Sequence, residues 1–196
     1  VFGLGRSGSS FFCDILSREK DAQNFNELFQ FNYLNPINLF SNVLKSSRKD
    51  EVIIKLLAHQ VLEKKVDLDS IISYSQKKGL ALKFINLRRE PFEQSLSLAY
   101  SLKTQNWHRK RTSKEFKNTK IPTNFYINVL ENIKINRFTE KEICEKLKNN
   151  YGYELVQYEK IKKGKNTSKY KKINHSGVVE RIDNLDELKN CFQEYS

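Results

Sequence analysis

Residues 1–18 read VFGLGRSGSSFFCDILSR, and this stretch decides the fold class. The apolar run at residues 1–4 is typical of a buried β-strand, and a glycine-rich turn over residues 5–8 follows it. Between Ser9 and Arg18 the apolar positions recur at helical spacing. The stretch therefore predicts a strand, a loop and a helix in direct succession.

Strand and helix patterns alternate farther along the chain. Short apolar runs at 52–58 and 81–87 indicate strands, and helical patterns follow them at 68–78 and 91–102. This alternation predicts an α/β fold, in which helices flank both faces of a parallel β-sheet and the crossovers are right-handed. We also expect a strand at 153–161 and a helix at 186–195.

Two segments are expected to interrupt this regular pattern. Residues 24–42 are rich in aromatic residues and Asn but have no clean period, so we expect an irregular excursion that carries function. Thr139 and Glu142 form a capping-box pattern, which predicts that one helix ends near Ile135 and that a second begins at Thr139.

Length and composition indicate a single α/β domain over residues 1–196, of which 38% are apolar. The chain has no Met, so we expect its native start to be missing. We find no apolar stretch of eighteen residues and no signal-peptide pattern, and we expect no membrane span. The three cysteines lack metal-site spacing, which argues against zinc and favours a reducing, cytoplasmic compartment.

The net charge of +12 indicates an anionic partner, which charge alone does not identify. Much of the excess lies in two short basic runs, at 108–120 and 160–172. Each run has the composition of a loop, and it is either a solvated lysine-rich surface or part of a ligand site. A nucleic-acid-binding protein without catalysis is one alternative that the charge leaves open, although we consider nucleic acid an unlikely partner.

The turn GLGRSGSS at residues 3–10 fits three anion-binding patterns. It matches the dinucleotide turn G-x-G-x-x-G, but no acidic residue that could bind a ribose ends a second strand. It also resembles a P-loop, although Ser9 stands where a nucleotide kinase or NTPase needs its Lys. The third pattern is a cation, a glycine and two hydroxyls at a helix start, where Arg6, Ser9, Ser10 and the backbone N–H groups would hold an anion without a metal.

This third pattern, Arg6-Ser7-Gly8-Ser9-Ser10-Phe11, resembles the 5′-phosphosulfate loop of the sulfotransferase superfamily. In that superfamily a later strand is followed by an Arg and, eight residues on, by a Ser, and the pair grips the donor's 3′-phosphate. Arg89 and Ser97 match these positions, with Pro91 between them as in the family. Arg88 is the alternative to Arg89.

The resemblance extends over residues 1–107 and is closest to the bacterial trehalose-type sulfotransferases. Glu27 precedes aromatic residues as in that family, although the Pro that the family has before this Glu is missing. Further matches are Lys55, Gln60, Gln94, Ala99, Gln105 and Trp107. The segment Lys162-Lys163-Gly164-Lys165 resembles a late basic segment that closes over the 3′-phosphate in some sulfotransferases.

The resemblance implies transfer of a sulfuryl group from 3′-phosphoadenosine 5′-phosphosulfate to a hydroxyl of a carbohydrate or glycolipid, with no metal. Glu27 would be the general base, with His59 as its substitute, and Arg6 would stabilise the transferring charge. The donor-binding residues would be Arg6, Ser7, Gly8, Ser9, Ser10, Phe11, Arg89 and Ser97. A P-loop nucleotide kinase or NTPase, and an inactive relative that only binds the nucleotide, are the remaining alternatives.

Overall fold

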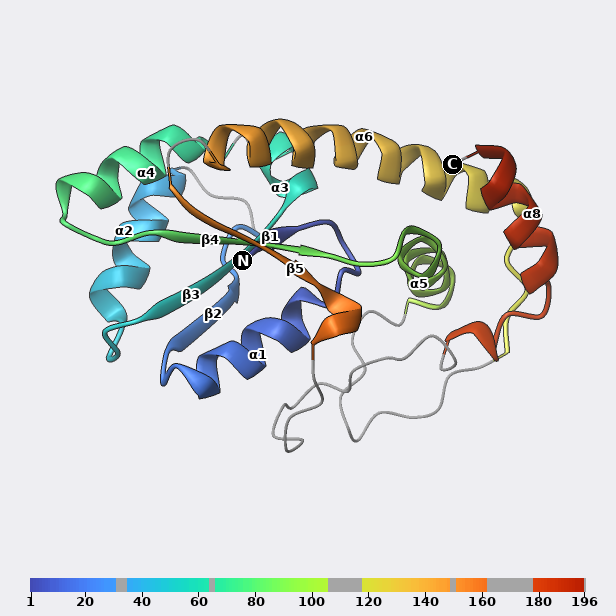
Figure 1. The fold of residues 1–196 in the computed structure, drawn as a ribbon, viewed down its shortest axis with the longest axis horizontal. Coiled ribbons are helices and arrows are strands. Elements are labelled where there is room, and N and C mark those ends of the chain that lie inside the picture. Colours follow the sequence, from blue (N-terminus) through green and yellow to red (C-terminus); the bar gives the residue numbers. More distant parts are fainter. Residues whose placement is uncertain (31–34, 64–65, 106–117, 149–150, 162–177, 196) are drawn as a thin grey trace.

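The computed structural model describes residues 1–30, 35–63, 66–105, 118–148, 151–161 and 178–195, which build a five-stranded parallel β-sheet with helices around it (Figure 1). The α/β fold with a parallel sheet is therefore confirmed. The strands are β1 (Phe2–Gly3), β2 (Gln23–Glu27), β3 (Val52–Leu57), β4 (Lys83–Arg88) and β5 (Gly152–Gln157). The helices are α1 (Ser9–Glu19), α2 (Pro36–Ser46), α3 (Ala58–Glu63), α4 (Leu68–Lys77), α5 (Pro91–Thr104), α6 (Thr123–Lys148) and α8 (Leu185–Tyr195), and a 3-10 turn, η1 (Tyr158–Lys160), follows β5.

Helices cover both faces of the sheet. Figure 1 shows α1 below the sheet and α3 and α6 above it. Phe2 and Leu4 belong to the large apolar cluster that includes α5 and α6 side chains, whereas Leu87 packs with Phe11 in a separate cluster beside α1. Because successive side chains of a strand point to opposite faces, each buried strand supplies apolar groups to both layers.

The strand order is β2-β3-β1-β4-β5, which places β1 in the centre of the sheet. Gly3 lies opposite Leu57 of β3 on one side and Leu87 of β4 on the other. The chain leaves β1 toward β2 and later crosses to β4, so the direction of winding changes at β1. Open α/β sheets bind ligands at such a switch point, beyond the carboxyl ends of the strands.

The expectation of an irregular excursion at residues 24–42 was wrong for the described part of this segment. Residues up to Glu27 form the edge strand β2, and Pro36 begins the helix α2. The Asn35 side chain accepts hydrogen bonds from the N–H groups of Ile37 and Asn38, so a regular N-cap starts α2. An Asn followed by Pro was a readable start signal that the aromatic composition obscured.

The predicted boundary between Ile135 and Thr139 was also wrong, because α6 continues through it. Thr139 is buried inside the helix, and its hydroxyl donates to the Ile135 carbonyl oxygen one turn earlier (3.4 Å). The segment contains neither Gly nor Pro, so nothing in it forces the backbone out of helical geometry. Ile133 and Ile143, on either side of the expected break, lie in the same apolar cluster.

Two global expectations can be compared with the described residues. Over these ranges, no helix has both the length and the apolar character that a membrane crossing requires. Cys13, Cys144 and Cys191 are all buried and free, and burial raises the pKa of the Cys13 thiol. Trp107 and most of the basic runs 108–120 and 160–172 lie outside the described residues.

The continuity of α6 is testable with two substitutions of Asn136. Asn136→Pro should lower the free energy of unfolding by about 3 kcal/mol or more, because it removes a helical hydrogen bond in mid-helix. Asn136→Ala removes the same side chain and keeps the helix, so we expect a change within about 1 kcal/mol. Urea denaturation followed by circular dichroism measures both values, and equal stability of the two variants would indicate two separate helices.

Candidate functional site

The loop from β1 to α1 lies at the switch point and has an unusual backbone. Gly8 is the N-cap of α1 with φ of 85°, and no side chain caps the helix. The N–H groups of the first turn therefore remain available to an anion. Arg6 has φ of 63°, a left-handed conformation that costs a residue with a side chain about 1–2 kcal/mol. Strain of this kind clusters at ligand sites.

Arg6, Arg89 and Ser97 come together at this loop. Arg6 Nε donates to Ser97 Oγ on α5 (3.1 Å), and Arg89 Nη1 donates to the Arg6 carbonyl oxygen (3.4 Å). Parallel pairing of β1 with β4 produces this contact, because Arg89 follows β4 just as Arg6 follows β1. The structure thus joins two motifs that lie far apart in the sequence.

The two guanidinium groups make the loop electropositive. Burial, together with the neighbouring charge of Arg89, lowers the pKa of Arg6 to about 10. Glu93 lies 3.3 Å from Arg89 and offsets part of this charge. Arg89 Nε and Ser7 Oγ are buried without a hydrogen-bond partner in the described structure. Since buried polar atoms normally have partners, an anion with several oxygen atoms would suit this cluster.

A second polar network connects Glu27 to the start of α1. The buried Lys55 ammonium of β3 forms an ion pair with Glu27 and donates to Ser10 Oγ (2.8 Å). Gln60 Nε2 donates to the second carboxylate oxygen of Glu27 (3.1 Å), and Gln60 is itself oriented by the N–H group of Leu57 (3.0 Å). The network fixes the Glu27 carboxylate and brings a cation to the loop, where the sequence has no P-loop Lys.

An irregularity in β2 makes this ion pair possible. Asn24 lies opposite Ile53, and Glu27 lies opposite Lys55. Between these two pairs β2 has one residue more than β3, which makes a β-bulge. Asn26 accommodates the bulge with a left-handed backbone (φ of 49°), and its N–H group donates to the Asn24 side chain (2.8 Å). A bulge of this kind redirects the following side chain.

Tyr158, which the sequence analysis did not single out, covers the loop from the end of β5. A Cβ atom added to Gly8 would lie 2.1 Å from the Tyr158 ring, so only glycine fits there. The Arg89 guanidinium lies 5.0 Å from the centre of the same ring, and Phe11 packs against its edge. The sequence analysis placed Tyr158 inside a strand expected over 153–161, whereas β5 ends at Gln157 and Tyr158 lies just beyond it, at the ligand-binding edge of the sheet.

The other residues that the sequence analysis singled out lie in or near the loop in some cases and away from it in others. Ser9 is buried in the first turn of α1, and the Phe11 side chain belongs to the apolar cluster beneath it. His59 is the second residue of the short helix α3, and within the described ranges no hydrogen bond or ion pair joins it to Glu27 or Arg6. Arg88, the alternative to Arg89, points toward α6 and lies 3.4 Å from Glu140.

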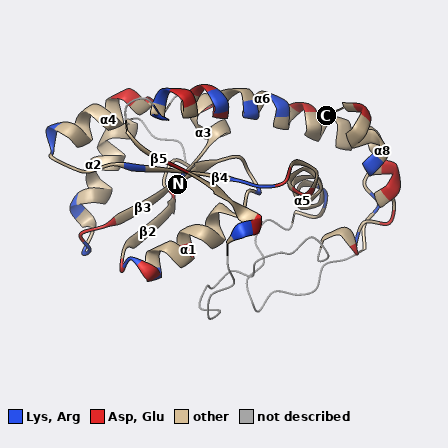
Figure 2. Ribbon diagram, in the orientation of Figure 1, with Lys and Arg blue, Asp and Glu red and all other residues tan. Residues whose placement is uncertain are grey.

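Figure 2 shows where the basic and acidic residues lie along the described ribbon. Along α6 basic and acidic segments alternate, so this helix does not present a continuous basic stripe of the kind that follows a nucleic-acid backbone. The connection from β4 to α5 carries basic residues and then Glu90. Across the described ranges, no three His, Cys, Asp or Glu side chains form a group that could hold a metal ion.

Comparison with known proteins shows no relatives: no family model, curated protein or solved structure matches the chain.

The contact between Gly8 and Tyr158 leads to a prediction about the loop. Gly8→Ala should lower the free energy of unfolding by at least about 2 kcal/mol, because it combines an unfavourable φ with a clash against the ring. Gly5→Ala is the matched control, since a Cβ atom there meets nothing within 4 Å. Both values come from denaturant titration.

A double-mutant cycle separates the two contributions. In a Tyr158→Ala background the Gly8→Ala substitution should cost about 1 to 2 kcal/mol, which is the backbone contribution alone. An unchanged cost in that background would mean that the ring does not restrict Gly8.

Proposed function

We propose that this chain is a sulfotransferase, which moves a sulfuryl group from 3′-phosphoadenosine 5′-phosphosulfate to a hydroxyl of a carbohydrate or glycolipid. The observation that carries the proposal is the convergence of Arg6, Arg89 and Ser97 beside the uncapped start of α1. Each of these residues belongs to one of two motifs that resemble the family, and their contact supports a single site for a donor with two phosphate groups.

The residues present fit such a donor. The α1 start, with Arg6, Ser9 and Ser10, would hold the 5′-phosphosulfate end through N–H groups, hydroxyls and one guanidinium. Arg89 and Ser97 would hold the 3′-phosphate. Ser97 Oγ accepts a hydrogen bond from Arg6, so its own proton is still available to a phosphate oxygen. The unpartnered Nε of Arg89 offers a further donor.

Glu27 suits the role of general base. Lys55 and Gln60 each engage one of its carboxylate oxygens, and each oxygen keeps a second lone pair that can accept a proton. The acceptor hydroxyl would give its proton to Glu27 while its oxygen forms a bond to sulfur. The bond from sulfur to the 5′-phosphate oxygen breaks, and the electron pair leaves with that phosphate. Arg6 is the residue placed to stabilise the charge that develops there.

Lys55 connects the proposed general base, Glu27, to the anion-binding loop. Its ammonium group contacts Glu27 and also Ser10, so it holds the base beside the anion-binding loop. In a P-loop kinase a Lys within the loop contacts the phosphates directly. Here the cation comes from β3 and is paired with a carboxylate, which favours a base-assisted transfer over the metal-dependent alternative.

Donor binding gives the first test of the proposal. Adenosine 3′,5′-bisphosphate should bind about tenfold to a hundredfold more tightly than AMP, because AMP lacks the phosphate that Arg89 and Ser97 would contact. Isothermal titration calorimetry measures both affinities, with ATP and Mg²⁺ as a third ligand. Arg89→Gln should bring the affinities for the bisphosphate and AMP close together.

Arg18→Gln is the control, since Arg18 is an exposed cation at the other end of α1. It should leave the preference for the bisphosphate intact. Equal binding of the bisphosphate and AMP by the unaltered protein contradicts the assignment of Arg89, and preference for ATP with Mg²⁺ favours the kinase alternative.

Turnover gives the second test. Glu27→Gln keeps the size of the side chain but cannot accept the proton, so turnover should fall by about a hundredfold or more while the bisphosphate binds nearly as before. Glu51→Gln is the matched control, because Glu51 is exposed and lies just before β3, and it should leave turnover unaltered. A screen of simple glycans and glycolipids with labelled donor supplies the acceptor. Full turnover in Glu27→Gln would exclude Glu27 as the base.

A further inference from the structure

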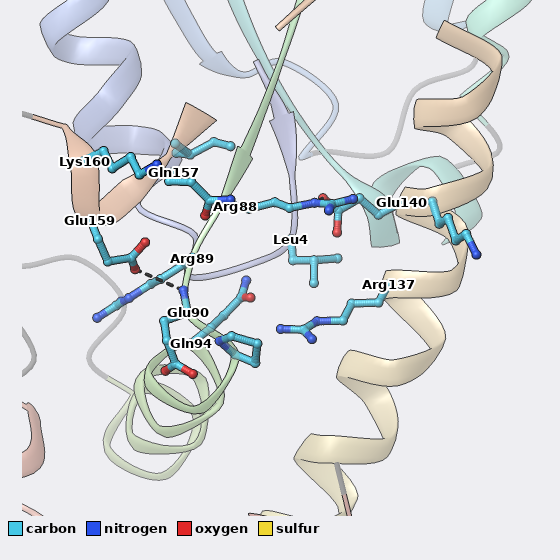
Figure 3. Close-up of a pocket in the computed structure, with 13 residues that line it drawn as sticks. Leu4, Arg88, Arg89, Glu90, Gln94, Arg137, Glu140, Gln157, Glu159 and Lys160 are labelled. Carbon is cyan, nitrogen blue, oxygen red and sulfur yellow. Dashed lines mark hydrogen bonds and ion pairs between the residues drawn. The ribbon is translucent and has the colours of Figure 1, made fainter. Parts of the chain in front are cut away.

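A pocket of about 720 Å³ lies beyond the carboxyl ends of β4 and β5, between α5 and α6 (Figure 3). Leu4, Leu87 and Pro91 give it apolar walls, while Arg88 and Arg137 bring charged groups to it. This size is within the usual range for pockets that bind small molecules, and apolar walls with a few polar groups are typical of them.

The pocket adjoins the anion-binding loop at Arg89, which lines it, and two consecutive arginines point to different sides of it. Arg89 extends toward Tyr158 and the loop, whereas Arg88 points the opposite way, toward Glu140 on α6 (Figure 3). Gln94 stands at the boundary, where its amide donates to the Gly5 carbonyl oxygen (2.8 Å). The α6 side of the pocket therefore has charged groups of its own.

Arg137 is the most informative of these groups. It reaches from α6 into the pocket toward Gln94, and it makes no hydrogen bond or ion pair with any described residue (Figure 3). Burial lowers its pKa, the charges of Glu140 and Glu90 partly offset this effect, and the charge of Arg88 adds to it. The half-buried guanidinium still has N–H groups without a hydrogen-bond partner among the described residues, and an anionic ligand in the pocket would supply acceptors for them.

Glu140 gives the pocket a second chemical character. Glu140 is 4% exposed and holds Arg88 at 3.4 Å. Glu90 also lines the pocket, but its carboxylate accepts hydrogen bonds from the N–H groups of Phe92 and Glu93 at the start of α5. Carboxylates accept hydrogen bonds, which the hydroxyl groups of a ligand can donate. A ligand that matches both features carries an anionic group for the arginines and hydroxyl groups for Glu140.

We propose that this pocket binds a sugar phosphate, with Arg137 and Arg88 holding the phosphate and Glu140 accepting hydrogen bonds from the hydroxyls. The inference goes beyond the proposed transfer reaction. Glu27 lies on β2, and β3 and β1 separate it from β4, so a ligand in the pocket is not the one whose hydroxyl Glu27 would deprotonate.

Calorimetry with the intact protein tests this proposal. Glucose 6-phosphate, fructose 1-phosphate and glycerol 3-phosphate are titrated in turn, and glucose and inorganic phosphate serve as the two partial ligands. We expect at least one of the phosphate esters to bind, and to bind about tenfold or more tightly than either partial ligand. Failure of adenosine 3′,5′-bisphosphate to bind in a separate titration would count against the proposed function and not against the pocket.

Matched variants locate the binding. Arg137→Gln should weaken the ester by about tenfold to a hundredfold, and Arg88→Gln is a second variant with the same expected direction. Lys134→Gln makes the same charge change one turn earlier on α6, outside the pocket, and should have no effect. Circular dichroism confirms folding. Failure of all three esters to bind, or equal weakening by Lys134→Gln, would overturn the proposal.

Discussion

Strand β1 hydrogen-bonds to β3 on one side and to β4 on the other, and the positions of the charged groups at the site depend on this double pairing. Because all three strands are parallel, their carboxyl ends lie at the same edge of the sheet. Lys55 therefore approaches the loop from the β3 side, and Arg89 approaches it from the β4 side. Gly3 permits the close packing this requires, since a Cβ atom there would lie 2.7 Å from the Leu87 carbonyl oxygen.

Most of the fold could be predicted from the sequence, because most helices and strands show one clear hydrophobic period. The strands at 52–57 and 83–88 and the helix after Pro91 carry their own start signals. The two failures had different causes. At residues 24–42 the aromatic composition obscured a local start signal, whereas at Thr139 a local cue competed with a tertiary one. Thr139 offers a capping pattern, yet the apolar faces on both sides of it pack into one core that keeps α6 continuous.

The candidate site was predictable only where its residues follow a motif. Arg6, Arg89 and Ser97 were singled out by their resemblance to family motifs, and the structure brings them into contact. The pairing of Glu27 with Lys55 depends on one extra residue in β2, and no sequence period encodes such a bulge. The pocket beside α6 depends on the continuity of that helix, so the error at Thr139 also hid Arg137.

The position of Tyr158 has a consequence for the order in which the molecule assembles. Tyr158 packs against Gly8 and Arg89, although Gly8 lies far before Tyr158 in the sequence. Contacts between distant residues form late, because a long loop must close before they are made. During synthesis the loop emerges before α6 and β5, but the side chain that covers it follows them. The loop therefore reaches its final shape only after α6 and β5 have been made.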